Sequence, residues 1–489
     1  MICLGIDLGT QSLKVLIYDS LAHRTLAAQS QPLELISGDG GVREQKAQWW
    51  IRALRACMER IDPDLRSSVQ VVSVSGQQHG FVPVDEKGGV LWNVKLWCDT
   101  STAAECREIE QKCGGRDAVV SRLGNPVLPG YTAGKIRWLY RHHPDVYGRL
   151  AHVLLPHDYL NWYLSGKYVM ERGDASGTGL LNIFTGQWDD AAAGAVAPGL
   201  SSLLPSVSQS PGIIGNICPE ASRDLGLPES CLVASGGGDN MMSAIGTGSV
   251  SDGDVTISLG TSGTLFTTSS RPACDAEGRF AAFCSSTGGW LPLLCTMNCT
   301  VASTAVMRLF GLDHAGMEDL LSSSSPGSGG LFMLPFLNGE RVPDYPDGEG
   351  VLLGMRPWNL TEANMLRCTL EGVTYGFLMG LEAFCEKGIA VRRLTLTGGG
   401  AKSPFWRQLV SDVTGYPVRI PAQEEAAAFG AVLHGLWCAT GGDISDVTGG
   451  HVAFSPEGRA VPDAASHDLY QKCYRKWLEH VAFFRPVFT

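Results

Sequence analysis

The chain has 489 residues, of which 44% are apolar, and a formal net charge of −11. A chain of this length exceeds one ordinary hydrophobic core, so two or three domains are expected. The negative charge and the lack of a basic run argue against nucleic acid or an anionic membrane surface as partner. No apolar run reaches the roughly eighteen residues that a membrane-spanning helix needs. Residues 2–6 already have the pattern of a strand rather than of a signal peptide, so a cytoplasmic protein is expected.

Fifteen cysteines are scattered along the chain, an odd number with no CxxC pair. Cys295 and Cys299 are spaced to face one way on a helix, but no second ligand pair accompanies them. Reduced, buried thiols are therefore expected rather than a disulfide framework or a zinc site.

The first predicted element is a hairpin with polar atoms at its tip. Residues 2–7 and 13–19 have the pattern of strands, and 8–11 form the turn between them. The same pattern recurs at residues 254–267, around the turn Gly260-Thr261-Ser262-Gly263. The chain is therefore expected to consist of two related halves produced by domain duplication.

Each half also shows helical periodicity, which together with the strands predicts an α/β protein. Residues 403–415 should form a helix, with Ser403 as N-cap before Pro404 and Gly415 as the stop. Two further apolar faces are predicted, one made by Trp50, Leu54, Cys57, Met58 and Ile61, the other by Leu469, Tyr470, Cys473, Trp477 and Val481. The Ser- and Gly-rich stretch 322–330 is expected to be a surface loop.

The sequence Gly236-Gly237-Gly238-Asp239-Asn240 follows the strand-like residues 231–234. Three glycines allow a sharp turn and leave room for a ligand to approach. A carboxylate at the mouth of such a turn is well placed to take a proton from a substrate hydroxyl. Asp239 is therefore a candidate general base, the alternative being that this stretch is only a turn.

Three other Gly-rich turns follow strand-like runs, at residues 7–10, 260–263 and 398–401. Backbone N–H groups in turns of this kind bind phosphate, and neighbouring hydroxyls add donors. Asp7 stands beside one of them, and a carboxylate next to phosphates needs a cation, which implies Mg²⁺. Two hairpins facing each other could hold a triphosphate, although residues 260–263 could equally be an ordinary hairpin turn.

Two polar motifs are suited to a polyol. Gln78 and His79 follow the strand 71–74 and offer hydrogen bonds, although a lone histidine is more often structural. Asp99 stands between Trp97 and several hydroxyl residues, and carboxylates accept hydroxyl protons while an indole packs against the C–H faces of a sugar.

These motifs together resemble the FGGY family of carbohydrate kinases, within the actin/Hsp70/hexokinase-like superfamily, over nearly the whole chain. Residues 130–142 match the first family signature at every specified place, and residues 334–341, LPFLNGER, resemble a stretch of the members that act on xylulose. The resemblance also covers the phosphate loop at 5–10, the sugar-contact motif at 78–80, the catalytic-base motif at 237–240 and the adenosine-side motif at 398–401.

The resemblance implies two RNase H-like domains around a central cleft, residues 1–245 and 246–489. It places the sugar mainly on the first domain and ATP·Mg²⁺ mainly on the second. The implied reaction is transfer of phosphate from ATP to the terminal hydroxyl of D-xylulose. A homodimer is left open. The implied roles are as follows: general base, Asp239; metal, Asp7 and Asp239; sugar, Gln78, His79, Asp99, Asp239 and Asn240; nucleotide, Thr10, Gly260, Thr261, Gly399, Gly400, Ala401 and Ser403.

One position departs from the family pattern. Many bacterial members that act on xylulose read W-N-D-G-R where this chain has Trp97-Cys98-Asp99-Thr100-Ser101, so Ser101 replaces the arginine. Ribulose, sedoheptulose or glycerol therefore stay open as alternative substrates. A more distant alternative is an actin- or chaperone-like ATPase, which would need the phosphate hairpins but not Gln78, His79 and Asp99.

Overall fold

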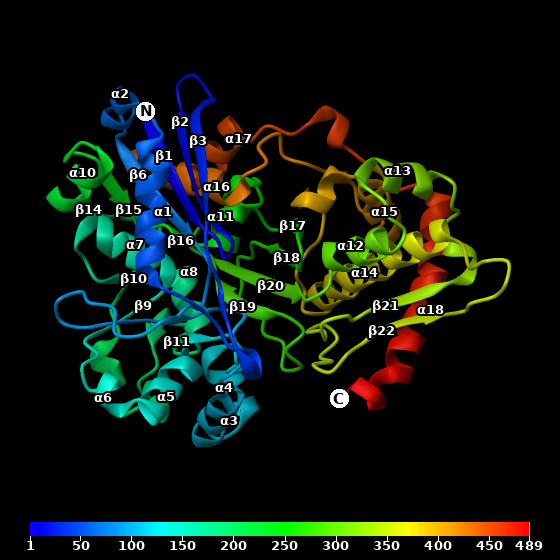
Figure 1. Cartoon of the computed structure of the whole chain (residues 1–489), viewed down its shortest axis with the longest axis horizontal. Helices are drawn as coiled ribbons and strands as arrows, with labels where there is room; N and C mark the ends of the chain where they lie inside the picture. The colour runs from blue at the N-terminus through cyan, green and yellow to red at the C-terminus, as the bar shows by residue number, and fades with distance from the viewer. Residues whose placement is uncertain (489) are drawn as a thin grey trace.

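The computed structural model describes residues 1–488. Figure 1 shows the chain as two lobes side by side, the first mainly from blue to green and the second mainly from green to red, with the orange helices α16 and α17 lying against the first lobe. Each lobe is built around a mixed β-sheet with helices packed on it, which is the α/β architecture expected from the sequence. In the described residues no helix is both long and apolar enough to cross a bilayer.

The sheet of the first lobe has the strand order β14-β15-β6-β1-β2-β3, with the short β16 also paired to β6. Its central strands β1 and β6 are parallel, and β2 and β3 run antiparallel to their neighbours. The strands are β1 (Ile2–Leu8), β2 (Ser12–Asp19), β3 (Arg24–Pro32), β6 (Val71–Gly76), β14 (Ile213–Asn216), β15 (Leu232–Ala234) and β16 (Gly237–Gly238).

The sheet of the second lobe has the order β19-β20-β18-β17-β23-β24. Again a first strand, β17, pairs antiparallel with the next, β18, and parallel with a later one, β23. The strands are β17 (Asp254–Leu259), β18 (Gly263–Thr267), β19 (Ala281–Cys284), β20 (Trp290–Thr296), β23 (Arg393–Thr397) and β24 (Val418–Arg419). Each half thus opens with a strand, a turn and a strand, as expected, and places a later strand parallel to the first; the origin of the halves by duplication stays a prediction.

Helices and shorter strands complete the two lobes. The short strands are β4 (Ile36–Ser37), β5 (Arg43–Gln45), β7 (Val82–Val84), β8 (Val94–Lys95), β9 (His152–Leu154), β10 (Val169–Glu171), β11 (Leu181–Asn182), β12 (Gln187–Trp188), β13 (Ser206–Ser208), β21 (Phe332–Pro335) and β22 (Gly350–Leu353). The helices are α1 (Ala47–Glu59), α2 (Pro63–Ser67), α3 (Ala103–Lys112), α4 (Arg116–Leu123), α5 (Thr132–His142), α6 (Pro144–Tyr147), α7 (Pro156–Ser165), α8 (Arg172–Ala175), α9 (Asp190–Val196), α10 (Pro219–Leu225), α11 (Asp239–Gly246), α12 (Thr300–Leu309), α13 (His314–Ser322), α14 (Glu362–Glu386), α15 (Pro404–Thr414), α16 (Ala426–Thr440), α17 (Ile444–His451) and α18 (Ala464–Phe488).

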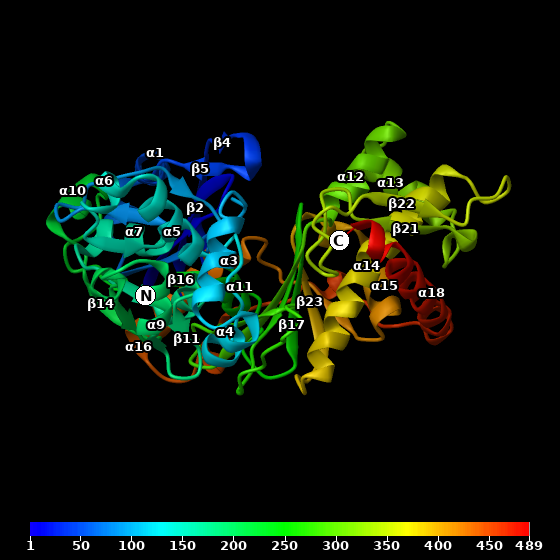
Figure 2. The same cartoon turned by 90° about the horizontal axis from the view of Figure 1, so that it is seen from below.

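The first sheet is buried on both faces. Helices α1 and α7 pack on one face in one apolar cluster, and α16 with α11 packs on the other in a second cluster. The strands consequently carry near-continuous apolar runs, as parallel strands covered on both sides do. In Figure 2 the second sheet lies on the side of the second lobe that faces the first lobe. Helices α14, α15 and α18 lie on the side of the sheet away from the first lobe.

Helices α11 and α16 cross at very close range where the two halves of the chain meet. A Cβ on Gly430 would lie 1.7 Å from the carbonyl oxygen of Met242, and one on Gly246 would lie 1.9 Å from that of Ala426. Only glycine permits this approach. Helix α16 comes from the second half of the sequence, yet it packs on β1 and β6 of the first sheet. The division into 1–245 and 246–489 stays a prediction. Helix α16, from the second part, packs against the sheet of the first part here.

The edge strand β19 of the second sheet attaches to the first lobe. The backbone N–H of Ala282 donates to Asn125 Oδ1 at 2.6 Å, and the amide of Asn125 donates to the carbonyl of Ala282 at 3.1 Å. The N–H of Cys284 donates to Ser176 Oγ at 2.9 Å. These bonds hold one side of the second lobe against the predicted sugar site.

Most local expectations are confirmed. Ser403 caps α15 by accepting from the N–H of Trp406, and Gly415 ends it at φ 74°. The apolar face of α1 is buried throughout. Leu469 was wrongly assigned to the buried face of α18, because its side chain is 39% exposed. Cys295 and Cys299 do not share a helix, since the first lies on β20 and the second just before α12.

The stretch 322–330 is only partly the surface loop that was expected. The N–H of Gly327 and the hydroxyl of Ser328 both donate to the buried carboxylate of Glu371, each at 2.9 Å. Ser328 is fully buried. This end of the loop is therefore anchored to α14.

Candidate active site

Asp239 stands at the junction between the first sheet and helix α11. β15 ends at Ala234, the chain turns through Ser235 and Gly236, and Gly237 and Gly238 pair with β6. Gly236 has φ 64°, and a Cβ there would lie 2.2 Å from the carbonyl oxygen of Val74. The glycine is therefore required by the protein's own backbone. Asp239 follows as the first residue of α11, where the helix dipole favours a negative charge.

One oxygen of the Asp239 carboxylate is held and the other is not. Oδ1 accepts hydrogen bonds from the backbone N–H of Asn240 at 2.8 Å and from its side-chain amide at 2.9 Å. Oδ2 has no hydrogen-bond partner within residues 1–488. Burial raises the pKa of Asp239 to about 7, and the charges of Asp7 and Asp174 act in the same direction. A carboxylate with this pKa is suited to exchange protons near neutral pH.

Asp7 is brought to the same edge of the sheet by the pairing of β1 with β6. It lies opposite Ser75, whose hydroxyl donates to Asp7 Oδ1 at 2.8 Å. Burial raises the pKa of Asp7 to about 6 despite this hydrogen bond. Because β16 pairs with the end of the same strand β6, Asp7 and Asp239 face one space. The electrostatic effect of Asp7 on Asp239 agrees with that placement.

Gln78 and Asn240 connect the predicted sugar residues to the predicted base. The amide nitrogen of Asn240 donates to Gln78 Oε1 at 3.1 Å as well as to Asp239. The side-chain nitrogen of Gln78 is buried without a hydrogen-bond partner in the described chain. The structure therefore brings Gln78, Asn240 and Asp239 together, and Gln78 also lies close enough to the buried Asp174 to counter the burial that raises the pKa of that carboxyl.

His79 adopts a left-handed backbone conformation, with φ 65°. Its ring lies 4.9 Å from Tyr131 and 5.4 Å from Phe283 of β19, measured between ring centroids. Nδ1 lies against Gly177, where a Cβ would come within 2.3 Å. Burial lowers the pKa of His79 to about 3, and the charge of Lys135 adds to this. The imidazole is thus neutral, and Nε2 has no hydrogen-bond partner among residues 1–488.

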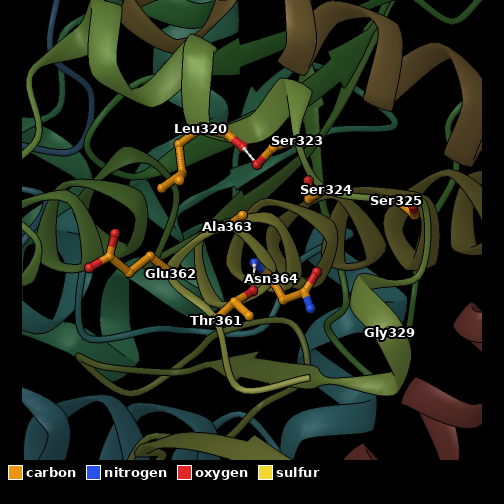
Figure 3. A pocket seen from close by; sticks show the side chains of 9 residues that line it. All are labelled: Leu320, Ser323, Ser324, Ser325, Gly329, Thr361, Glu362, Ala363 and Asn364. Carbon is orange, nitrogen blue, oxygen red and sulfur yellow. Dashed lines mark hydrogen bonds between the residues drawn. The ribbon is translucent and has the colours of Figure 1, made fainter. Parts of the chain in front are cut away.

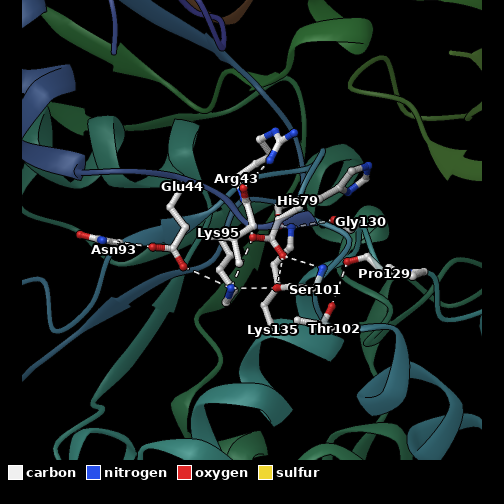
Figure 4. A network of polar contacts seen from close by, with 12 residues as sticks. Arg43, Glu44, His79, Asn93, Lys95, Ser101, Thr102, Pro129, Gly130 and Lys135 are labelled. Carbon is white, nitrogen blue, oxygen red and sulfur yellow. Dashed lines mark hydrogen bonds and ion pairs between the residues drawn. The ribbon is translucent and has the colours of Figure 1, made fainter. Parts of the chain in front are cut away.

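Asp99 is fully buried in a polar network, of which Figure 4 labels Lys95, Ser101 and Arg43. Its Oδ1 accepts from the hydroxyl of Ser101 at 2.5 Å, and its Oδ2 accepts from the N–H of Arg43 at 2.8 Å and from Lys95 Nζ at 3.3 Å. Both oxygens are therefore already engaged by the protein. Direct contact of Asp99 with a sugar stays a prediction, and a supporting role agrees better with these bonds.

The same network accounts for the serine at position 101. Lys95 Nζ lies 2.9 Å from Ser101 Oγ and 3.1 Å from Glu44 Oε1, and it sits 4.3 Å above the ring of Trp138. Lys95 is 2% exposed. A buried lysine thus provides the countercharge that Asp99 needs, without an arginine in the loop itself.

Thr10 lies at the tip of the first hairpin, on the side of the sugar residues. Its hydroxyl donates to Gln77 Oε1 at 3.1 Å and accepts from the indole N–H of Trp97 at 2.9 Å. The hairpin itself is closed by the N–H of Gly9, which donates to the carbonyl of Ser12 at 3.0 Å. Thr10 therefore joins the phosphate hairpin to the Trp97 loop.

The predicted nucleotide residues of the second lobe lie together. Gly260 and Thr261 form the tip between β17 and β18, and their carbonyls accept from the first N–H groups of α12 and from Cys299. The 3-10 turn Gly399–Lys402 packs on the end of β17, where a Cβ on Gly398 would lie 2.8 Å from the backbone of Leu259. Ser403 then caps α15. Contact with a nucleotide stays a prediction for each of these residues.

Two lysines of the site were not singled out from the sequence. Lys135 is fully buried and donates to the carbonyls of His79 at 2.8 Å and Gly130 at 2.7 Å. Burial lowers its pKa to about 7. Lys14 on β2 pairs with Glu425 at 2.5 Å, close enough to Asp7 to affect its pKa. Lys135 stands within the family signature, and Lys14 follows the turn of the first hairpin. These two positions could have pointed to both lysines in the sequence.

A buried cluster behind the turn also escaped the sequence analysis. His157 donates through Nδ1 to Asp174 at 3.0 Å and through Nε2 to the carbonyl of Ser235 at 2.8 Å. Burial alone would lower the pKa of His157, but Asp158 and Asp174 outweigh it and raise the pKa to about 9. The imidazolium thus lies between the carboxyl groups of Asp158 and Asp174. Its bond to the carbonyl of Ser235 fixes the residue at which the turn to Asp239 begins.

A separate hollow of about 530 Å³ lies between the end of α13 and the start of α14 (Figure 3). Ser323, Ser324 and Asn364 are among the residues that line it, and none of the predicted site residues does. The hollow is therefore distinct from the space around Asp7 and Asp239.

Comparison with known proteins agrees with this geometry. The chain is 37% identical to a xylulose kinase from Haemophilus influenzae over 98% of this chain and 99% of that protein. It is 36% identical to a xylulose kinase from Streptomyces rubiginosus over 91% of this chain and 89% of that protein.

Solved structures show the same fold. A structure described as a xyloylose kinase from Brucella ovis superposes with a TM-score of 0.93 at 28% identity, over the whole of both chains. A glycerol kinase from Plasmodium falciparum, 18% identical, superposes with a TM-score of 0.87 over 98% of each chain and supports the fold alone. The protein therefore has the two ATPase-like domains that were expected.

Models of the FGGY family of carbohydrate kinases match both parts of the chain, the N-terminal domain at residues 2–246 and the C-terminal domain at 255–439. These matches and the relatives leave no support for the alternative of an actin- or chaperone-like ATPase without a sugar. The chain belongs to the FGGY family of carbohydrate kinases.

Proposed function

We propose that this enzyme transfers the terminal phosphate of ATP to the terminal hydroxyl of D-xylulose, giving D-xylulose 5-phosphate and ADP. The choice of sugar is carried by the near full-length similarity to xylulose kinases, at up to 37% identity. The type of chemistry is supported by the unpartnered Oδ2 of Asp239 beside Gln78 and Asn240.

In the proposed reaction Asp239 takes the proton of the attacking hydroxyl. The sugar oxygen forms a bond to the γ-phosphorus while the bond from that phosphorus to the β,γ-bridging oxygen breaks. ADP leaves with the electron pair of the broken bond. The pKa of about 7 for Asp239 suits both uptake of this proton and its later release to water.

The sugar lies mainly on the first lobe in this proposal. The neutral His79 offers Nε2, and Gln78 offers its unpartnered amide. Buried polar groups of this kind discriminate between sugars, since the wrong epimer leaves them without partners. Asp99 supports the loop of Trp97 from behind, through its bonds to Lys95 and Ser101.

The nucleotide would lie between the two hairpins. Thr10 on the first lobe would offer its backbone N–H to phosphates, and Gly260 and Thr261 on the second lobe would offer backbone N–H groups and the hydroxyl of Thr261. The residues Gly399, Gly400, Ala401 and Ser403 would line the nucleoside side. Phosphoryl transfer requires alignment and charge neutralisation more than covalent help from the protein.

The donor set also fits Mg²⁺. Asp7 and Asp239 are two half-buried carboxylates, and Oδ2 of each has no hydrogen-bond partner in residues 1–488. Such oxygens are the ligands that this cation prefers. Asp7, with Asp239 beside it, would hold the ion, which would neutralise phosphate charge when bound.

The proposal is tested by incubating the purified protein with ATP, Mg²⁺ and D-xylulose and following ADP release in a coupled assay. Phosphorus NMR of the product should show a phosphomonoester on the terminal carbon. The variant Asp239→Ala is the matched control for contaminating kinases. Absence of a sugar phosphate, or the same yield from that variant, would refute the proposal.

A further inference from the structure

Arg341 belongs to the second lobe but reaches the sugar side of the first. It follows Glu340 in the segment between β21 and β22. Glu340 is 5% exposed, and its Oε1 accepts the N–H of Met297 at 2.7 Å and the N–H of Arg341 itself at 2.8 Å. The backbone that carries Arg341 is thus fixed to the end of β20.

The side chain of Arg341 lies against the loop that carries the predicted sugar residues. Its guanidinium carbon is 5.8 Å from the centre of the Trp97 ring. Its Nη2 lies 3.8 Å from the place that a Cβ on Gly130 would occupy. Its charge is close enough to affect the pKa values of His79 and Tyr131, in which burial is the larger cause. The cation therefore faces the same space as His79.

The guanidinium is half-buried, and within residues 1–488 no hydrogen bond or ion pair engages it. Its neighbour Glu340 forms no ion pair with it, and the oxygens of Glu340 instead accept from backbone N–H groups and the amide of Asn298. Lys95 and Lys135, on the other side of this space, are buried and fully engaged by carboxylates and carbonyls. Of these three cations, Arg341 is the one whose N–H donors have no hydrogen-bond partner in the described residues.

A guanidinium presents five N–H donors in a rigid fork. In a half-buried position without partners, it gains most from a ligand that is rich in oxygen atoms. On the first lobe, His79 Nε2 has no hydrogen-bond partner among residues 1–488, and the side-chain nitrogen of Gln78 is buried without one. Gly130 packs closely under the Trp97 loop, since a Cβ there would lie 2.7 Å from the carbonyl oxygen of Trp97.

We propose that Arg341 is a sugar-binding residue that the second lobe contributes, donating hydrogen bonds to oxygen atoms of the ketose held by His79 and Gln78. This inference rests on the proposed sugar kinase activity and adds a specific residue to it. The sugar site then includes both lobes, so binding of the sugar favours their approach. Arg341 thereby supplies a guanidinium to the sugar site, which Ser101 does not supply.

The test compares Arg341→Met, which keeps an unbranched apolar side chain but removes the charge and the N–H donors, with Arg341→Lys. Arg356→Met is the control, because Arg356 is an exposed arginine of the same lobe. Sugar and nucleotide affinities are measured separately by calorimetry, together with kcat and KM. The sugar used is whichever one the unmodified enzyme phosphorylates fastest.

Loss of hydrogen bonds from a charged group should raise the sugar Kd and KM in Arg341→Met by about ten- to a hundredfold. Nucleotide affinity and Tm should stay unchanged, Arg341→Lys should recover part of the sugar affinity, and Arg356→Met should match the unmodified enzyme. An unchanged sugar Kd in Arg341→Met overturns the proposal. So does a fall in kcat alone, which would place Arg341 on the transferred phosphate.

The two proposals fail in different measurements. A preferred sugar other than xylulose, seen in the unmodified enzyme, contradicts the proposed substrate. The ratio of sugar affinities between Arg341→Met and the unmodified enzyme, taken with that same sugar, decides the role of Arg341. If Arg341→Met lowers Tm, the comparison is repeated with Arg341→Gln at a temperature where both proteins are folded.

Discussion

Asp7 and Asp239 face one another at the edge of the first sheet, and burial together with the charge of Asp7 raises the pKa of Asp239 to about 7. The pairing of β1 and β16 with the same strand β6 produces this relationship. Two carboxylates that are forced together ionise less readily than either alone. The pair therefore combines a base poised near neutrality with a natural place for a cation.

This relationship predicts the pH dependence of the reaction. Only the ionised form of Asp239 accepts a proton, so kcat/KM should rise with pH up to about 7 and then level off. Below that pH the rate should fall by about tenfold for each pH unit. The measurement is kcat/KM in the coupled assay from acidic to alkaline pH. A profile that is flat through neutral pH would contradict the assignment of the base.

Asp239→Ala should lower turnover by about 10²- to 10⁴-fold, the usual loss for a general base. Nucleotide binding, measured by calorimetry, should survive, because the predicted nucleotide residues lie on other elements. Wild-type turnover in this variant would show that another group takes the proton.

The fold could be predicted from the sequence to a large extent. The two hairpins, at residues 2–19 and 254–267, and the cap and stop of α15 were expected because apolar periodicity and turn chemistry are local properties. Leu469 was misassigned because a helical pattern gives the side of a helix but not the width of the face that neighbours cover. The close crossing at Gly246 and Gly430 depends on residues far apart in the chain and left no such local pattern.

The site was predicted less completely than the fold. Asp239, Asp7 and Gln78 were identified because each stands beside a turn or polar motif at the end of a strand-like run. Asp99 was identified as well, but the pattern of its loop did not reveal that Lys95 and Arg43 already engage its oxygens. Contacts of that kind are set by tertiary packing, which spacing along the chain does not record.

His79→Ala should weaken sugar binding and leave nucleotide binding unchanged. An unmet sugar hydroxyl costs about 1–3 kcal/mol, which corresponds to a rise in KM of roughly tenfold or more. Because the pKa of His79 is lowered to about 3, this effect should not change between weakly acidic and alkaline pH. His314→Ala, at an exposed histidine, is the control. Lost Tm with unchanged sugar affinity in His79→Ala would assign this residue to the fold instead.

Asp7→Asn should impair turnover by weakening the use of Mg²⁺, with sugar affinity close to that of the unmodified enzyme. It should also shift the acidic limb of the pH profile to lower pH, because it removes a negative charge beside Asp239. A titration of activity against Mg²⁺ concentration checks the first point. An identical metal dependence in the variant would exclude Asp7 from the metal site.

The central claim is the identity of the sugar, and kcat/KM values for D-xylulose, ribulose, sedoheptulose and glycerol test it most directly. Ribulose differs from xylulose in the configuration of one hydroxyl, so one misplaced hydrogen bond should cost about tenfold or more. The account predicts the highest kcat/KM for D-xylulose, with ATP as donor. A higher value for any of the other three would contradict it.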